Sequence, residues 1–333
     1  MNIVVLAGGL SMERDVSLAS GSLIANALRE YGHKAILVDL YYGIDKDKMN
    51  FDNVEGRYEY KIPEIAPNLD AIIASNGGRE NPVGENIVEF CKMADVAFLA
   101  LHGGVGENGK LQALFEMNGV KFTGSSSIGC MLSMDKIISK ELVAREGIPT
   151  AEWLTNKDDR EALNQLIPCF VKPADNGSSV GVTKVTSKEA LENALCEAEK
   201  FSENVLVEKQ VVGREFSVGV LDGKALPPIE IVASGEFYDY KVKYQAGLAY
   251  EICPAPLSDE LTKKLQSYAE RAHKVLRLGS YSRIDFILDS DDEFFFLEAN
   301  ALPGMTPTSL LPQEAAAAGM SYTELCLKLI ELA

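Results

Sequence analysis

The chain has 333 residues, which is long enough for two or three domains that bury a substantial core. Its formal net charge of −17 argues against binding of a nucleic-acid backbone as the main activity, but it leaves room for a nucleotide in a local basic pocket. Six cysteines without a CxxC pair predict reduced thiols and no disulfides, and three dispersed histidines argue against a zinc site. No apolar run has the length of a membrane span, so we expect a cytoplasmic protein.

The N-terminal third predicts an open parallel α/β sheet. Apolar runs predict strands at 2–7, 34–40, 70–74 and 96–101, and a helical pattern covers 17–31. A strand, a Gly-rich loop, a helix and a second strand in this order are typical of folds that bind ligands at the carboxyl ends of their strands.

Two Gly-rich loops follow strands of this sheet, at 8–17 and 101–109. Their small residues allow close approach of a ligand, but the GxGxxG spacing is absent, so a dinucleotide-binding fold is rejected. Glu13 in the first loop is suited to a ligand ammonium, with a solvated loop charge as the alternative. His102 in the second loop is as consistent with a structural histidine as with a polar site.

The remaining chain predicts two further lobes. Helical patterns cover 126–147 and 187–201, with short strands at 170–173 and 205–211. Strand-rich sequence begins after Gly213, so the predicted domains are 1–124, 125–211 and 212–333. A polar, aromatic loop at 235–250 has the length of an active-site lid, with a mobile surface loop as the alternative.

The segment Lys172–Gly181 contains hydroxyls and glycines that can wrap phosphate oxygens. It is not a Walker A loop, and a flexible hairpin loop is the alternative. Strand 205–211 has backbone edges that can pair with an adenine ring. Lys136, Lys172, Glu208 and Glu215 taken singly are ordinary surface residues.

The most distinctive segment is a predicted hairpin from Tyr281 to Asn300 with its turn at 290–292. Alternation places Arg283 and Asp285 on one face, and a hairpin centred near Asp291 places Asp285 roughly opposite Glu298. The same alternation predicts a common face for four residues of the second strand: Phe294, Phe296, Glu298 and Asn300. Two carboxylates and a carboxamide suit Mg²⁺, whereas the alternative is a hairpin with an exposed charged face.

A Pro303-Gly304 turn directly continues the carboxylate strand. A backbone N–H at such a turn, close to the predicted metal site, can stabilise an oxyanion. The alternative is a simple exit turn.

Taken together, these motifs resemble those of the D-alanine–D-alanine ligase family within the ATP-grasp superfamily. The matching blocks appear in family order between residues 8 and 312: GGLSMERDVS, LHGGVGENG, MDK, FVKPADNGSSVGV, VEKQVVGREFSV, FYDYKVKY, SRIDFIL and LEANALPGMTPTSLLP. The resemblance implies an α/β ATP-grasp fold that follows an N-terminal open parallel α/β domain along the chain. It also implies ligation of two D-alanines through an acyl phosphate, for peptidoglycan precursor synthesis.

The resemblance further implies roles for individual residues. Metal ligands for two Mg²⁺ ions, with Mn²⁺ as a substitute, would be Asp285, Glu298 and Asn300. Residues for the co-substrate ATP would be Lys136, Lys172, Ser178, Ser179, Glu208, Lys209, Val211, Glu215 and Lys243. D-Alanine would contact Glu13, His102, Arg283, Ser309 and Leu310. Catalysis would depend on Glu13, Ser178, Tyr244, Arg283 and Gly304, and the protein would be a homodimer.

Two positions depart from the family's commonest pattern, Asn108 in place of aspartate and Ala301 in place of threonine. Neither change removes an implied catalytic group, although both affect fine placement of their loops. Tyr244 is typical of ligases with an amino acceptor, so a depsipeptide product is disfavoured, while D-serine as second substrate stays an alternative. A nucleotide-binding regulatory protein with a decayed site is a further alternative, which the intact motifs disfavour.

Overall fold

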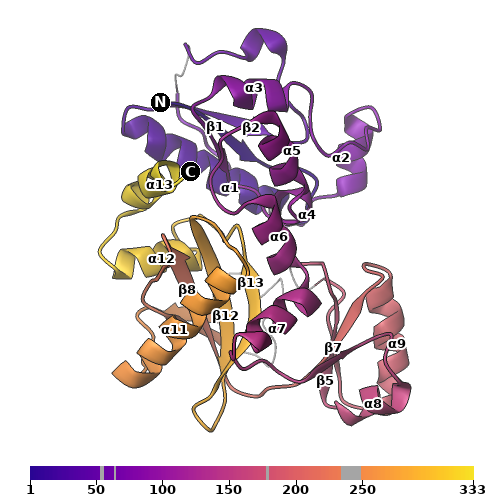
Figure 1. The fold of residues 1–333 in the computed structure, drawn as a ribbon. Coiled ribbons are helices and arrows are strands. Elements are labelled where there is room, and N and C mark those ends of the chain that lie inside the picture. The colour runs from indigo at the N-terminus through magenta and orange to yellow at the C-terminus, as the bar shows by residue number, and fades with distance from the viewer. Residues whose placement is uncertain (53–55, 64, 178–179, 234–248) are drawn as a thin grey trace.

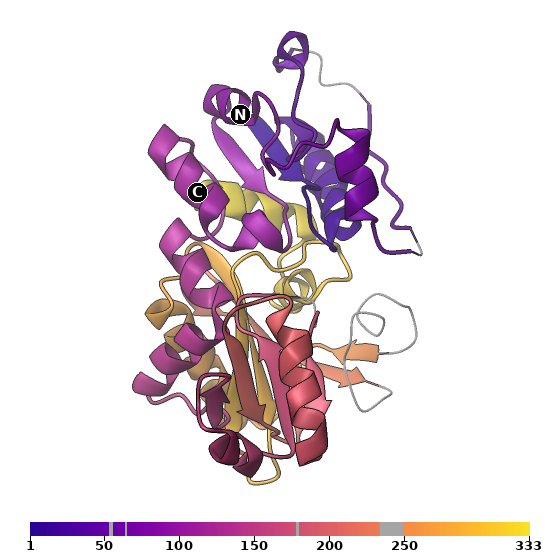
Figure 2. The same cartoon turned by 90° about the vertical axis from the view of Figure 1, so that its right-hand side faces the viewer.

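The computed structural model describes residues 1–52, 56–63, 65–177, 180–233 and 249–333. Its strands form three sheets, called here the N-terminal, central and C-terminal sheets, with three, four and six strands. Figures 1 and 2 show the N-terminal sheet at one end of the molecule and the two other sheets together at the opposite end.

The N-terminal sheet is parallel, with strand order β2-β1-β3. Residues 3–7 and 96–99 are buried because helices cover both faces, which is the reason that these strands are apolar without alternation. This arrangement confirms the predicted open parallel α/β sheet. Its elements are β1 Asn2–Ala7, α1 Arg14–Glu30, β2 Lys34–Asp39, the 3₁₀-helix η1 Lys46–Lys48, α2 Leu69–Ser75, α3 Ile87–Met93, β3 Val96–Leu99, α4 Gly104–Glu107 and α5 Lys110–Asn118.

The predicted strand at 70–74 is wrong, because this segment is helix α2. The side chain of Asn68 caps the helix by accepting a hydrogen bond from the Ala71 N–H at 3.0 Å. An apolar run this short does not distinguish a strand from a helix by its periodicity, and here the cap decides.

The predicted single helix over 126–147 is also wrong. It is divided into α6, Ser127–Met134, and α7, Lys136–Arg145, at Asp135, whose backbone is extended. The Asp135 carboxylate accepts from the N–H groups of Ile137 and Ile138, both at 3.0 Å, and so begins the new helix. The break directs Lys136 towards the segment 174–176, where its backbone N–H donates to the Ala174 carbonyl oxygen at 2.9 Å.

The central sheet is antiparallel, with strand order β4-β7-β5-β6. Helix α9 covers one face, and its Leu191 and Leu195 pack on Val171 and Val207 of the strands. The elements are β4 Trp153–Thr155, α8 Arg160–Gln165, β5 Cys169–Pro173, β6 Thr183–Val185, α9 Lys188–Glu199 and β7 Val205–Lys209.

The C-terminal sheet has strand order β11-β10-β8-β12-β13, with β9 paired to β8. Helix α11 packs on a core in which the Phe216 and Phe294 rings, and the Phe286 and Phe296 rings, meet edge to face. The elements are β8 Arg214–Leu221, β9 Lys224–Ala225, β10 Ile229–Ala233, β11 Ala249–Ile252, α11 Asp259–Val275, β12 Tyr281–Leu288, β13 Phe294–Asn300, α12 Leu310–Ala317 and α13 Tyr322–Glu331.

In the hairpin of β12 and β13, Asp285 lies opposite Glu298, as predicted. The predicted common face of β13 is wrong, because the register shifts between Asp285 and Phe286, whose partners are Glu298 and Phe296. Leu297 is therefore the extra residue of a β-bulge. The bulge reverses the alternation, so the phenylalanines at 294 and 296 enter the core while Glu298 and Asn300 face the opposite side.

The chain returns at its end to the N-terminal sheet. Helix α13 lies against α1, and Leu325 and Leu329 belong to the same core as Leu6 and Leu28. The side chains of Ser321 and Glu324 form the capping box at the start of α13. The boundaries at 124 and 211 stay a prediction. No helix in the described part of the chain has both the length and the apolar character needed to cross a membrane.

Replacing Asp135 by alanine should destabilise the protein, because two N–H groups at the start of α7 lose their acceptor. We expect the free energy of unfolding to fall by about 0.5–2 kcal/mol, as for other lost N-caps. Urea unfolding measures this loss, and Asp135→Asn is the matched control that keeps an acceptor. An equal loss in both variants would contradict the capping role.

Candidate active site

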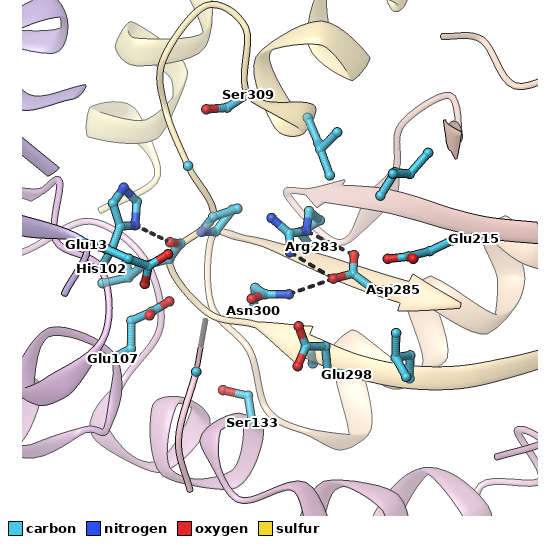
Figure 3. A pocket seen from close by; sticks show the side chains of 18 of the residues that line it. Glu13, His102, Glu107, Ser133, Glu215, Arg283, Asp285, Glu298, Asn300 and Ser309 are labelled. Atoms are coloured by element: carbon cyan, nitrogen blue, oxygen red, sulfur yellow. Dashed lines mark hydrogen bonds and ion pairs between the residues drawn. The ribbon is translucent and has the colours of Figure 1, made fainter. Parts of the chain in front are cut away.

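A cavity of about 890 Å³ lies between the three sheets. All of the predicted site residues that the structure describes line it: Glu13, His102, Lys136, Lys172, Glu208, Lys209, Val211, Glu215, Arg283, Asp285, Glu298, Asn300, Gly304, Ser309 and Leu310. Four predicted residues lie outside the described part of the chain: Ser178, Ser179, Lys243 and Tyr244. Figure 3 shows how side chains from the N-terminal and C-terminal sheets converge on this space.

Asp285 lies at the centre of a hydrogen-bonded group on β12 and is only 4 % exposed. Arg283 donates to both of its carboxylate oxygens, from Nε at 2.9 Å and from Nη2 at 2.8 Å. Ser217 on β8 donates to Oδ1 at 2.7 Å, and Asn300 donates its amide to Oδ2 at 3.0 Å. The donors fix the carboxylate in place, and they also offset the free-energy cost of its burial.

Glu298 lies beside this group with its carboxylate towards the cavity (Figure 3). Lys136 approaches it, with 3.6 Å between Nζ and Oε2, and also donates to the Asn176 carbonyl oxygen at 2.7 Å. Carboxylates and a carboxamide on one face, with a lysine at the edge, form an oxygen-rich site next to a positive charge. Such a site fits a hard divalent cation together with phosphate oxygens.

The end of the cavity at the central sheet contains a second ion-paired group. The Glu208 carboxylate receives Lys172 at 2.5 Å and Lys140 at 2.6 Å. Burial acts to raise the pKa of Glu208, but the two lysines outweigh it and hold that pKa below its usual value. Lys209, Val211 and Glu215 follow along the cavity wall. Lys140 was not predicted from the sequence.

The opposite end of the cavity is formed by the two Gly-rich loops. His102 is 7 % exposed; its Nδ1 lies 3.2 Å from the Leu302 carbonyl oxygen, and its Nε2 has no partner among the described residues. Burial lowers the pKa of His102, so the ring is neutral, with Nδ1 donating and Nε2 left as an acceptor. Glu107 accepts from the Gly103 N–H at 2.5 Å, and burial raises its pKa to about 8.

A partly buried ion pair between Arg14 and Asp39 holds the first loop against the sheet. Arg14 also donates to the Gly9 carbonyl oxygen at 2.7 Å, which ties the loop to the start of α1 next to Glu13. Gly8 has φ of +72°, and a Cβ there would lie 2.4 Å from an oxygen of Asp39. Only glycine satisfies both conditions, so the glycine pair serves the loop's geometry.

The turn after β13 leads into the N-terminus of α12. The Ser309 N–H donates to the Thr306 carbonyl oxygen at 2.8 Å, and the Ser309 hydroxyl lies 2.8 Å from the hydroxyl of Thr306. A Cβ at Gly304 would lie 2.9 Å from the Ser309 hydroxyl, so the backbone at 304 runs close to the helix start. The N–H groups there, together with the helix dipole, favour an anion such as a carboxylate.

Several cavity residues were missed by the sequence analysis. Tyr60, Lys61 and Ile62 line the wall near Glu13, and the Tyr60 hydroxyl donates to Asp15. No local pattern distinguishes these residues from the polar stretch around them. Glu107 did offer a signal, since it is an acidic residue within the same glycine loop as His102.

Glu314 on α12 is a buried carboxyl group next to this site. It is fully buried; Oε1 accepts from the Gly219 N–H at 2.9 Å, and Oε2 has no partner among the described residues. Gly219 is the cross-strand partner of Arg283, and a Cβ there would lie 2.7 Å from Oε2. The missing side chain of Gly219 therefore makes room for the carboxyl group on the Arg283 side of the sheet. Burial raises the pKa of Glu314 to about 8.

Two protein-family models match nearly the whole chain. The model described as D-ala D-ala ligase N-terminus matches residues 2–125, and the model described as D-ala D-ala ligase C-terminus matches residues 142–331. The chain is 41% identical to a D-alanine–D-alanine ligase of Pediococcus pentosaceus over 340 residues, which cover 99% of this chain and 97% of the relative. It is 42% identical to one of Lawsonia intracellularis, with 100% and 98% covered.

Solved structures give the same result. A D-alanine–D-alanine ligase from Bacillus anthracis complexed with ATP superposes with a TM-score of 0.75 at 29% identity, covering 100% of this chain and 96% of that one. The D-alanine–D-alanine ligase from Coxiella burnetii gives a TM-score of 0.77 at 25% identity, with 100% and 93% covered.

The Glu314→Gln variant should show a different pH dependence of stability. With the folded pKa near 8 and an ordinary value of 4.5, the folded protein keeps a proton that the unfolded chain loses. Stability from this group is thus fully present below the unfolded pKa and is lost as pH rises towards the folded pKa. Glutamine cannot ionise, so the variant avoids that loss.

We therefore expect the free energy of unfolding of the variant, minus that of the unsubstituted protein, to increase between about pH 5 and pH 8. The slope should approach roughly 1.4 kcal/mol per pH unit. Urea unfolding across this pH range measures it, with Glu331→Gln at an exposed carboxylate as the control. A difference that does not change with pH would contradict a neutral Glu314.

Proposed function

The chain belongs to the D-alanine–D-alanine ligase family, and from this premise we propose how its residues carry out the ATP-dependent ligation of two D-alanines. The ATP-grasp fold expected from the motifs is confirmed by the solved structures of the family. The product, D-alanyl-D-alanine, serves peptidoglycan synthesis.

One observation supports the assignment of roles: a carboxylate site, lysines suited to phosphate and a helix N-terminus all line the same cavity, around Arg283. Each of these features suits one part of the reaction. A carboxylate oxygen of the first D-alanine attacks the γ-phosphorus of ATP, and ADP leaves. The amine of the second D-alanine then attacks the acyl phosphate carbon, and phosphate leaves.

We assign the nucleotide to the end of the cavity at the central sheet. Lys136 and Lys172 provide positive charge for the phosphates, as the transferred group requires positioning and neutralisation more than covalent chemistry. The adenine and ribose are assigned to the wall formed by Glu208, Lys209, Val211 and Glu215. Ser178, Ser179 and Lys243 keep their proposed roles at the phosphates from the family resemblance.

We assign Mg²⁺ to Asp285, Glu298 and Asn300. The donor set contains oxygen ligands on one face, and since Asn300 donates its amide nitrogen to Asp285, its carbonyl oxygen stays available. When bound, Mg²⁺ supplies charge neutralisation for the phosphate oxygens, and Mn²⁺ fits the same ligands. Arg283, which now pairs with Asp285, offers its remaining donors to the cavity.

We assign the first D-alanine to Glu13 and His102. A neutral His102 with a free acceptor at Nε2 suits an ammonium, and Glu13 supplies the opposite charge. Arg283 and the Gly304 N–H would stabilise the oxyanion of the tetrahedral intermediate.

The second D-alanine is assigned to the start of α12, at Ser309 and Leu310. Its carboxylate would accept hydrogen bonds from the N–H groups of the first helical turn, and its amine would then be directed towards Arg283 and the acyl phosphate. From the family resemblance, we also assign to Tyr244 a hydrogen-bonded link with Glu13 and Ser178 that closes the site.

ADP release should depend on D-alanine. We expect turnover with D-alanine alone, less or none with L-alanine, and no turnover without ATP, measured by a coupled ADP assay. Offering D-serine together with D-alanine tests the acceptor, since a mixed dipeptide would support the D-serine alternative. A mixed product with D-lactate would contradict the expectation that no depsipeptide forms. An absence of D-alanine-dependent ADP release would contradict both the proposed residue roles and the proposal that D-alanine is the acceptor.

Glu298→Gln should lower turnover by at least about a hundredfold, because the ligand carboxylate loses its charge while the side-chain volume is kept. Thermal unfolding checks that the fold is intact. Asp291→Asn is the matched control, since Asp291 lies in the exposed turn of the same hairpin. Near-normal turnover of Glu298→Gln at several Mg²⁺ concentrations would contradict the metal assignment.

A further inference from the structure

Lys140 is the most deeply buried lysine of the described chain, with a fully covered side chain on α7. Its Nζ donates to Glu208 Oε1 at 2.6 Å and to the Thr150 hydroxyl at 2.5 Å, and it lies 4.9 Å above the centre of the Trp153 ring. The Thr150 hydroxyl donates in turn to the Phe296 carbonyl oxygen at 3.0 Å, so its own role towards Lys140 is that of acceptor. These contacts suit an ammonium.

Burying a lysine is costly, so a purely structural position would more often be occupied by an apolar residue. Burial lowers the pKa of Lys140, and the adjoining Glu208 carboxylate opposes that shift, so Lys140 depends on Glu208 to keep its proton. Glu208 itself is 3 % exposed and lies between Lys140 and Lys172. We call these three residues the lysine–glutamate cluster.

The lysine–glutamate cluster contains two ammonium groups and one carboxylate, which leaves one positive charge. The two lysines differ in position, since Lys172 lines the cavity and Lys140 is covered by protein. Glu208 uses one oxygen for each of them. The charge that remains is therefore available at Lys172, on the side that faces the cavity.

We propose that Lys140 is a positioning residue for the polyphosphate of the nucleotide: it neutralises Glu208 from behind, so that Lys172 keeps its positive charge for the phosphates. This inference rests on the proposed ATP site. Without Lys140, the full charge of Glu208 would be directed at Lys172, and the cluster would be neutral. Adenosine lacks phosphates, so its binding does not depend on this charge.

The test compares dissociation constants for ATP with Mg²⁺ and for adenosine, by calorimetry at one ionic strength. The ratio of the adenosine constant to the ATP constant isolates the contribution of the phosphates. In Lys140→Met we expect this ratio to fall about tenfold, with adenosine affinity changed by less than about twofold. Lys200→Met removes an exposed lysine of the same lobe, paired with Glu197, and should leave the ratio unchanged.

The double variant Lys140→Met/Glu208→Gln makes the inference sharper. It removes one charge of each sign and returns the cluster to a single positive charge at Lys172, so the ratio should recover towards that of the unsubstituted protein. Any direct contact of Glu208 with the adenine affects both ligands and cancels in the ratio. Lys140→Gln keeps a hydrogen-bond donor without the charge, and it carries the same expectation if the methionine variant does not fold.

An unchanged ratio in Lys140→Met and Lys140→Gln would overturn the inference, as would a double variant no better than the single one. Equal weakening of adenosine and ATP would also overturn it, because it would assign Lys140 to the protein core alone. An unsubstituted protein that does not prefer ATP to adenosine would instead contradict the proposed ATP site.

Discussion

Strands β12 and β13 have one apolar face and one charged face. One face is packed with the phenylalanines of the C-terminal core, and the other carries Arg283, Asp285, Glu298 and Asn300. A regular β13 would direct Glu298 and Asn300 to the same face as Phe294 and Phe296, since all four have the same parity. The bulge at Leu297 removes this conflict by adding one residue at the place where the strand changes from core to site.

The charges of this face are stable because they are paired before any ligand arrives. Asp285 receives Arg283, Ser217 and Asn300, and Ser217 comes from the neighbouring strand β8. A buried carboxylate with several donors is held in one rotamer, which is the preorganisation that a charged transition state requires. The same principle applies at Glu208, where two lysines share one carboxylate. Each buried carboxylate in this cavity is therefore stabilised by several donors together.

The sequence predicted the parts of the site that depend on local pattern. The turn at 290–292 sets the pairs nearest to it, such as Phe286 with Phe296, and without a bulge this register would place Asp285 opposite Leu297. The predicted position of Asp285, roughly opposite Glu298, is therefore met because of the bulge, which has no signature in an apolar run such as Phe294–Leu297. The strand expected at 70–74 failed for a related reason, since a run of that length fits both periods and the Asn68 cap decided between them. Residues 60–62 reach the cavity only through tertiary packing, and nothing local to them indicates that position.

The position of Lys140 was partly predictable from the sequence. It lies four residues after Lys136 on α7, and residues with this spacing share a face of a helix. Two lysines on one face would ordinarily point to solvent, but the Asp135 break turns the start of this helix towards the cavity. Lys136 then meets Glu298 of the C-terminal sheet, and Lys140, one turn deeper, meets Glu208 of the central sheet. A single short helix thus brings one cation to each of the two carboxylate groups, and the spacing of those cations is set by the pitch of the helix.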